Sequence, residues 1–598
     1  MNMKFILLIL AILCIVFSLI GEASPAFQGM ERINAEEINN QINNNKIINY
    51  DNKYIDGDLK FGHKSSDRSL RSIIKITNSY INGSVYFNDT LFWGPISFNN
   101  SYFAYPVYLQ NSFFNKNANF HNCNFTSDAN FYNSSFAQDA YFYGSQFGML
   151  ADFYACNFKN DIYFYDSVFS GAAEFEECNF SGMARFDSDI YSGEAVFSRA
   201  NFSAEANFEN IKYSKKMFFT ETIFSGDTRF SGCGPYNESG NDEAELDFSD
   251  ARFHAYCAFL NAHLNFAKFS RSLFTRKVEF IGSSFSGDET KIDQANFTDY
   301  ADFSYAVFSS NEIIFDETHF GDYADFYNTA FHGNVSFIDA RFLNKVNFND
   351  AIFEHNAAFE DAQFSMDGMF QGSHFQQDVD FVGSRFYENG YFRRSQFSGS
   401  VNLDDAQFKD IFFDSSLFQK NAMLHLNGTQ FDKIYLRWDR INGSFFKDCR
   451  LIYDDEAYLS LIQNYKGLGW VRDANECYLE YKIKYRSHLF GLYWIADFFL
   501  CGLYGYGAKP EYAIFWSLIL IFACALFFWR NDHMRLKDAL TLSGITFLSG
   551  TGKLLVTEPP YNPKNRAQLA RLAFNTQRLL AGLLIFLFIL AVTKTVTI

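Results

Sequence analysis

The chain has 598 residues, of which 75 are phenylalanine and only 8 are proline, and its formal net charge at pH 7 is −18. This apolar content is sufficient for an extensive core. The acidic balance argues against a nucleic acid partner, because phosphate backbones are bound by clustered Lys and Arg. HExxH, paired CxxC, GxSxG and phosphate-binding glycine motifs are absent from the sequence, and its 11 His are scattered singly. We therefore expect no enzyme, no cofactor and no metal site.

The first predicted element is an export signal. Residues 1–24 combine Lys4, an apolar run over residues 5–20, and the small residues Ala23 and Ser24. This is the pattern of a secretory signal peptide, and an uncleaved signal anchor would have the same features. Either element predicts that the chain that follows lies outside the cytoplasm.

Phenylalanine then recurs at alternating spacings of five and six residues. In the stretch VNFNDAIFEHNAAFEDAQF it occupies Phe348, Phe353, Phe359 and Phe364. This rhythm is neither the 3.6-residue period of a helix nor the two-residue alternation of one strand. The unit is small-x-Phe-x-x followed by small-x-Phe-x-x-x, which is eleven residues. It predicts one short strand and one turn per phenylalanine, with the small residue and the Phe facing inward.

This pattern resembles the pentapeptide-repeat family, whose motif is A-(D/N)-(L/F)-x-x and whose fold is a right-handed, roughly four-sided β-helix. The resemblance extends over about residues 76–436. One extra residue in every second unit implies four faces and a coil of about 22 residues. The predicted fold class is therefore mainly β, a right-handed quadrilateral β-helix of 5+6-residue Phe-centred repeats in residues 76–440, with roughly sixteen coils.

The ends of the repeats and one interruption are also visible. Residues 30–75 predict an N-terminal cap and a first coil, with a helix in residues 30–46. Residues 231–246 are rich in turn formers and acids, which indicates a surface loop and a candidate point of contact. The rhythm ends after Leu436 and Trp438.

Four of the ten cysteines lie two residues before a repeat phenylalanine, where other repeats have Ala, Ser, Val, Thr or Gly: Cys123, Cys156, Cys178 and Cys257. We interpret them as small core residues rather than as disulfide partners. The inferred coil length predicts that Cys156 and Cys178 stack on one face in adjacent coils, whereas Cys123 lies on another face.

Helical patterns replace the repeats in the last quarter of the chain. Residues 450–487 predict a helical hairpin, with apolar residues at helical spacing on both sides of Gly467 and Gly469. Residues 489–507 are apolar but contain Asp497, so we expect an interfacial helix. Residues 511–598 contain two candidate transmembrane helices, Tyr512–Trp529 and Leu579–Thr593.

The segment between these two spans resembles the pore helix and filter of two-transmembrane potassium-channel domains. The matching residues of DALTLSGITFLSGTGK are Ser543, Thr546, Phe547, Gly550 and Gly552, and the filter-like positions are Ser549, Gly550, Thr551 and Gly552. One residue is missing before the glycines, Thr551 replaces an aromatic residue, and Lys553 stands where an acid is usual. Because a potassium filter works by aligned backbone carbonyls, these departures predict a degenerate pore that does not conduct.

The favoured interpretation is a protein of the cell membrane whose extracytoplasmic rod is an interaction or spacer module, with the membrane and an unnamed protein as partners. Basic residues between the two spans place that segment in the cytoplasm, which agrees with an exported rod. The alternative is an oligomeric ion channel, a tetramer with the rods as sensors. A third possibility implied by the family resemblance, an acidic helix that mimics DNA and binds a topoisomerase, requires a cytoplasmic rod.

Overall fold

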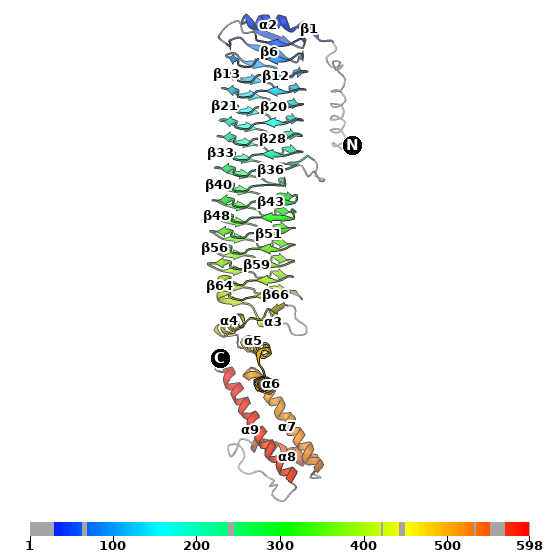
Figure 1. Ribbon diagram of the computed structural model, residues 1–598, viewed down its shortest axis with the longest axis vertical. Coiled ribbons are helices and arrows are strands. Elements are labelled where there is room, and N and C mark those ends of the chain that lie inside the picture. Colours follow the sequence, from blue (N-terminus) through cyan, green and yellow to red (C-terminus); the bar gives the residue numbers. More distant parts are fainter. Residues whose placement is uncertain are drawn as a thin grey trace. The chain divides into compact units, whose positions relative to one another are not determined.

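The computed structural model describes residues 29–61, 68–236, 244–419, 422–441, 449–531, 534–549 and 568–596. The predicted export signal, residues 1–24, lies outside this set. The chain divides into two compact units, Met1–Gln419 and Lys420–Ile598. The first unit is a β-solenoid and the second is mainly helical (Figure 1).

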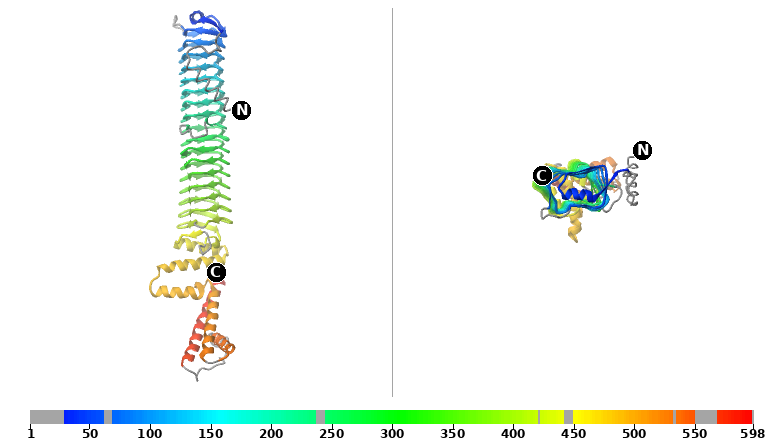
Figure 2. Two further views of the ribbon diagram at one scale, coloured as in Figure 1. Left: turned by 90° about the vertical axis from the view of Figure 1, so that its right-hand side faces the viewer. Right: turned by 90° about the horizontal axis from the view of Figure 1, so that it is seen from above.

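The solenoid has about 18 turns and consists mostly of two-residue strands, each paired in parallel with the strand one coil further on. Strand β15 (Asn124–Phe125) pairs with β19 (Gln146–Phe147), with Asn124 opposite Gln146 and Phe125 opposite Phe147. The Asn124 side chain donates to the Gln146 side chain, 22 residues further along the chain. Figure 2 shows the coils end-on as a four-sided outline. The predicted four-faced coil and its length are confirmed.

Phenylalanine fills the interior because most repeat Phe point inward and stack on an equivalent Phe in the next coil. The rings of Phe125 and Phe147, both 1% exposed, have centroids 5.0 Å apart and planes 9° apart. Rings from different columns meet edge-on, as Phe142 and Phe153 do at 5.2 Å and 83°. Each buried ring contributes roughly 1.5–3 kcal/mol of transfer free energy, and aromatic pairing adds to it. The core is therefore one continuous array of rings.

The five-residue spacing contains a left-handed turn that explains the frequent asparagine two residues after Phe. Asn100 and Asn122 have φ of 58° and 54°, a conformation that Asn tolerates better than most residues. Their side chains continue the stacking, because Asn122 Nδ2 donates to Asn100 Oδ1 over 3.1 Å. The six-residue spacing has no such turn, so the alternation of five and six reflects two kinds of corner.

The small residue that follows the left-handed turn forms hydrogen bonds to neighbouring coils inside the wall of the solenoid. Ser112 Oγ donates to the carbonyl of Phe87 over 3.0 Å and accepts from the amide of Thr90 over 3.1 Å. Cysteine occupies the same position, since Cys156 Sγ and Cys178 Sγ donate to the carbonyls of residues 131 and 153. Both thiols are buried and free. The prediction of small core cysteines is confirmed.

The cysteines also confirm the predicted register. Cys156 and Cys178 precede β21 (Asn157–Phe158) and β25 (Asn179–Phe180), which are paired neighbours, and the Asn179 amide donates to the Cys156 carbonyl over 2.9 Å. Cys123 precedes β15, which belongs to a different ladder.

The regular strand pairing of two of the four ladders lapses in the middle of the solenoid. It lapses between β35 (Gly234–Pro235) and β39 (His263–Asn265), and between β36 (Leu246–Asp247) and β43 (Glu289–Lys291), where Lys268 forms single parallel bridges to Asp247 and Lys291. The coils here are irregular. Side chains bonded between neighbouring coils lie 21 residues apart for Asp250 and Arg271, and 23 residues apart for Ser270 and Asp293. The predicted loop, residues 231–246, adjoins this region, and residues 237–243 of it lie outside the described chain.

A helix covers the first coil. Strand β1 (Glu31–Asn34) leads into α2 (Ala35–Asn43), and Asn34 Oδ1 caps the helix by accepting from the Glu36 amide over 2.8 Å. Ala35, Ile38 and Ile42 are buried, so an amphipathic helix shields the buried Ile48 and Leu59 of the first coil from water. The structure thus has a helix within residues 30–46, where the sequence indicates one.

The second unit begins with short strands and continues as helices. Its elements are β66 (Ala422–His425), β67 (Gln430–Tyr435), α3 (Trp438–Ile441), β68 (Cys449–Leu451), α4 (Asp455–Gly467), α5 (Val471–Tyr485), η2 (Arg486–His488), α6 (Leu492–Tyr504), η3 (Gly505–Gly507), α7 (Pro510–Asn531), α8 (Leu536–Leu548) and α9 (Gln568–Val596). Helices α4 and α5 close over buried Trp438, whose amide donates to Asp473 Oδ1 over 2.9 Å.

Candidate membrane-anchoring site

Helices α7 and α9 are long and apolar enough to cross a membrane. The windows Pro510–Asn531 and Arg571–Thr593 have mean hydropathies of 2.2 and 2.0, and only 17% and 28% of their best 18-residue stretches are buried. Large apolar side chains project outward, among them Leu518 at 61% and Phe586 at 60% exposure. The core helix of a water-soluble protein would bury such residues. These two helices are the candidate membrane spans of the described chain.

Helix α8 packs against both candidate spans, which also contact each other (Figure 1). Near its start, Ala539 and Leu542 pack with Phe528 of α7 and Phe574 of α9. Near its end, Phe547 packs with Ala581 and Leu584 of α9, and Leu520 and Ile521 of α7 lie against this cluster. Since residues 520 and 521 lie halfway along α7, the end of α8 reaches the middle of the α7–α9 pair.

A polar node links α8 to both spans. Ser543 Oγ donates to the Ile521 carbonyl over 2.7 Å, and Gln577 Nε2 donates to Ser543 Oγ over 2.7 Å and to the Ser543 carbonyl over 2.9 Å. Gln577 is 1% exposed, and its buried Oε1 has no hydrogen-bond partner among the described residues. Polar side chains in this setting hold membrane helices together.

The four filter-like positions are only partly visible. Ser549 follows the end of α8, is 2% exposed, and donates from Oγ to the Thr546 carbonyl over 2.6 Å. Gly550, Thr551 and Gly552 lie outside the described residues. Arg578 Nη2 of α9 donates to the Ser549 carbonyl over 3.4 Å. A guanidinium at this carbonyl is unfavourable for a passing cation.

Helix α6 lies across the direction of α7 and α9 (Figure 2, left). Most of its residues are exposed, including Leu492 at 82% and Tyr493 at 78%. Trp516 of α7 donates from Nε1 to the Gly502 carbonyl over 2.7 Å, which fixes the end of α6 against the candidate span. An apolar helix across the spans, with aromatic residues, is the arrangement of an interfacial element.

A charged triad holds α6 to the end of α5. Arg486 donates from Nε to Asp497 Oδ2 over 2.7 Å and from Nη2 to the Tyr506 hydroxyl over 2.8 Å, and that hydroxyl also donates to Asp497. Burial opposes the charge of Arg486, but these hydrogen bonds outweigh it and raise the arginine pKa. Sequence reasoning missed the triad, although the single acid in an apolar segment, Asp497, was the signal for it.

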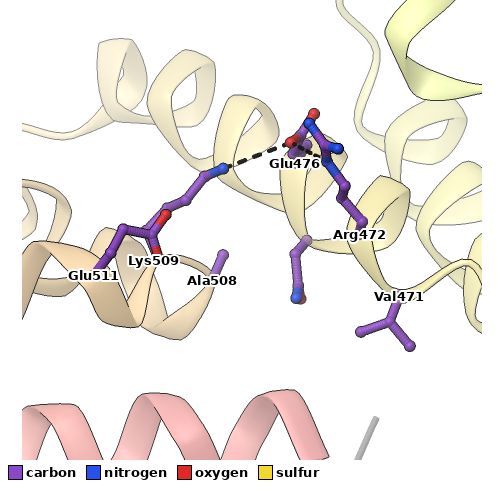
Figure 3. A pocket seen from close by; sticks show the side chains of 7 residues that line it. Val471, Arg472, Glu476, Ala508, Lys509 and Glu511 are labelled. Atoms are coloured by element: carbon purple, nitrogen blue, oxygen red, sulfur yellow. Dashed lines mark hydrogen bonds and ion pairs between the residues drawn. The ribbon is translucent and has the colours of Figure 1, made fainter.

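A cavity of about 540 Å³ lies beside the start of α7 (Figure 3). It is lined by Val471, Arg472, Asn475, Glu476, Ala508, Lys509 and Glu511. Figure 3 shows the Arg472 and Lys509 side chains directed at Glu476 from opposite sides. Among the described residues, three or more His, Cys, Asp or Glu nowhere form a group that could hold a metal ion.

On the solenoid, outward-facing aromatic residues form columns of their own. The rings of His121, Tyr143 and Tyr165 are stacked with centroids 4.7 and 4.8 Å apart, and the Arg185 guanidinium lies 4.6 Å from the Tyr165 centroid. Trp93 and Tyr105, nearer the N-terminus, are 46% and 51% exposed. Sequence reasoning missed these columns, although His121, Tyr143 and Tyr165 each follow a core Phe directly and recur every 22 residues.

Four stretches of the solenoid match a family described as pentapeptide repeats (9 copies): residues 120–168, 164–212, 315–363 and 370–417. These matched stretches of the β-solenoid are pentapeptide repeats. The pentapeptide matches omit residues 213–314, which contain the interrupted ladders and the irregular coils. Comparisons with curated proteins and with solved structures found no match.

Proposed function

We propose that this protein is a membrane-tethered, non-catalytic pentapeptide-repeat rod that acts outside the cytoplasm as an interaction or spacer module. The observation that carries the proposal is the exposed apolar surface of α7 and α9, because helices with this surface are stable in lipid and not in water. The export signal read from the sequence and the basic residues between the spans support the orientation.

The interaction role is supported by the outward aromatic columns of the solenoid. Aromatic residues are enriched in protein interfaces, whereas the outer wall of a solenoid needs only polar residues for solubility. The acidic net charge argues against a nucleic acid partner. The partner of the rod is therefore proposed to be a protein, held at a distance from the bilayer.

Tethering is tested on isolated membranes and orientation in intact cells. Membranes from cells that express the full chain are washed with alkaline carbonate, and the protein is expected to stay in the pellet. In a separate experiment, intact cells that express the Tyr105→Cys or the Arg535→Cys variant are treated with an impermeant maleimide and compared with cells that express the parent chain. Labelling at residue 105 from outside, and at residue 535 only after permeabilisation, is expected. The opposite labelling would place the rod in the cytoplasm.

The second candidate is the oligomeric ion channel, which the depth of α8 and the buried Gln577–Ser543 node favour. Polar groups inside a membrane domain commonly line a pathway. Arg578 at the Ser549 carbonyl argues against cation passage. Native mass spectrometry in detergent separates the two functions. Four chains per particle, with potassium flux in liposomes, would establish the channel, and a single chain would leave the tethered rod.

A further inference from the structure

Two positive charges, one on α5 and one on the residue just before α7, converge on one carboxylate beside the start of α7. Arg472 Nε donates to Glu476 Oε1 over 3.1 Å, and Lys509 Nζ lies 3.6 Å from the same oxygen. The three side chains together have a net charge of +1. The Arg472 side chain is 86% exposed, and its hydrogen bond to Glu476 uses Nε, so its terminal nitrogens face the solvent side of the group. One further negative charge would neutralise this trio, Arg472, Glu476 and Lys509.

The cavity of about 540 Å³ described above is bounded by this trio, and Glu511 lines it as well (Figure 3). Its volume lies in the range of small-ligand sites. Lys509 and Glu511 flank Pro510, the first residue of α7, and outward apolar side chains begin at Tyr512, which is 39% exposed. If α7 spans the bilayer, the cavity therefore lies at the depth of the lipid head groups.

We propose that this cavity binds the head group of a phospholipid, with the phosphodiester on Arg472 and Lys509. This inference rests on the proposed membrane tethering. A phosphodiester has a single negative charge, which matches the +1 of the trio, and a guanidinium can donate two hydrogen bonds to two phosphate oxygens. Basic pockets beside membrane helices are suited to lipid head groups. Glu511 accommodates the amine of a phosphatidylethanolamine.

The test uses the full-length protein, purified in mild detergent and mixed with phosphatidylethanolamine or with diacylglycerol, which has the same tails and no phosphate. Native mass spectrometry measures the lipid retained per chain. We expect retention of phosphatidylethanolamine over diacylglycerol, and a loss of roughly tenfold or more in an Arg472→Gln/Lys509→Gln variant. Equal retention of the two lipids, or an unchanged double variant, would overturn the proposal.

Two further variants distinguish loss of the phosphate contact from a nonspecific effect of substitution on the protein. Glu476→Gln alters the same trio but removes a negative charge, so it should retain the lipid at least as well as the parent. Arg440→Gln/Lys466→Gln removes two exposed charges elsewhere in the helical unit and should change nothing. A loss of lipid in either variant equal to that in Arg472→Gln/Lys509→Gln would contradict a phosphate contact at the cavity.

Soluble competitors identify the source of the phosphate. Inorganic phosphate or glycerophosphoethanolamine that displaces the lipid at equal concentration would show a site for free phosphate esters and overturn the lipid assignment. Flotation with phosphatidylethanolamine vesicles measures membrane association of the chain independently. A chain that does not float contradicts the proposed function and this inference together, whereas one that floats but shows no head-group preference contradicts this inference alone.

Discussion

The solenoid and the helical unit bury apolar residues in opposite ways. In the solenoid, the repeat phenylalanines are nearly all within 2% of complete burial, and polar residues cover the wall. In α7 and α9, many large apolar side chains face outward, although Phe528 and Phe574 are buried against α8. The difference follows from the backbone. A two-residue strand satisfies its hydrogen bonds only by stacking on another coil, which encloses a core, whereas a helix satisfies its own and can present apolar side chains to lipid.

The largest effect is expected from a deletion that moves the left-handed turns to different corners of the coil. Removing residues 324–328 places two six-residue spacings in succession, so every later left-handed turn falls on the wrong corner. We expect the thermal transition of the full chain, followed by circular dichroism, to broaden and fall, with a loss greater than the roughly 3–5 kcal/mol of a buried Phe→Ala change.

The matched control removes residues 324–345, which is one whole coil and joins Tyr323 to Val346 in register. This variant should keep a cooperative transition close to that of the parent. If both deletions unfold alike, the coil is not the unit of folding.

The next largest effect is expected from Phe348→Ala. Phe348 is fully buried and stacks on Phe326 at 4.7 Å and on Phe370 at 5.0 Å. The cavity left in the ring array should lower the free energy of unfolding by about 3–5 kcal/mol in denaturant titration. Tyr305→Ala, at a side chain that is 53% exposed, should cost less than about 0.5 kcal/mol. Equal losses would show that the solenoid lacks a uniquely packed core.

A smaller, pH-dependent effect is expected at Asp189, which replaces the small hydroxyl residue inside the wall. It is fully buried, accepting from the Ser167 amide over 2.8 Å and from the Tyr191 hydroxyl over 3.2 Å. Burial raises the pKa of this carboxyl well above its usual range. The folded state thus holds a proton that the unfolded chain releases near pH 4, so the contribution to stability is complete below that pH and falls as pH rises toward the folded pKa.

Asp189→Asn keeps an acceptor and removes the titration. Its free energy of unfolding, derived from thermal unfolding at each pH, should not show the decline above pH 4. At pH 7 it should exceed that of the parent by up to about 1.4 kcal/mol for each pH unit between the unfolded and the folded pKa. Asp166→Asn, at an exposed position, serves as the control. Parallel pH curves for parent and Asp189→Asn would indicate that Asp189 is ionised in the folded protein.

The smallest effect is expected in the helical unit. Gln577→Leu removes the amide that joins α9 to α8, and polar contacts between membrane helices contribute about 0.6 kcal/mol on average. The loss should be small in an SDS unfolding titration, and Thr576→Val, at an exposed neighbour, should be neutral. A loss of stability several times larger would indicate that the Gln577–Ser543 contact is a main determinant of the position of α8.

Sequence by itself determined the solenoid because its contacts are local and repeated. A repeat phenylalanine contacts the equivalent residue one coil further on. The alternation of five- and six-residue spacings therefore predicts the register, the four faces and the stacking of Cys156 on Cys178. The two candidate spans are also readable, since length and hydropathy decide them. The lapse of regular strand pairing in the middle of the solenoid is indicated only by the changed coil lengths beside it.

Tertiary structure alone decided the contacts of the helical unit. Ser543 and Gln577 are 34 residues apart, and Arg472 reaches the same carboxylate as Lys509, which precedes α7. A single polar residue in an apolar run can face a neighbouring helix, a lipid head group or solvent, and nothing in its local spacing selects among them. Helices pack through side chains alone, so their partners follow from the geometry of the whole unit rather than from a repeat.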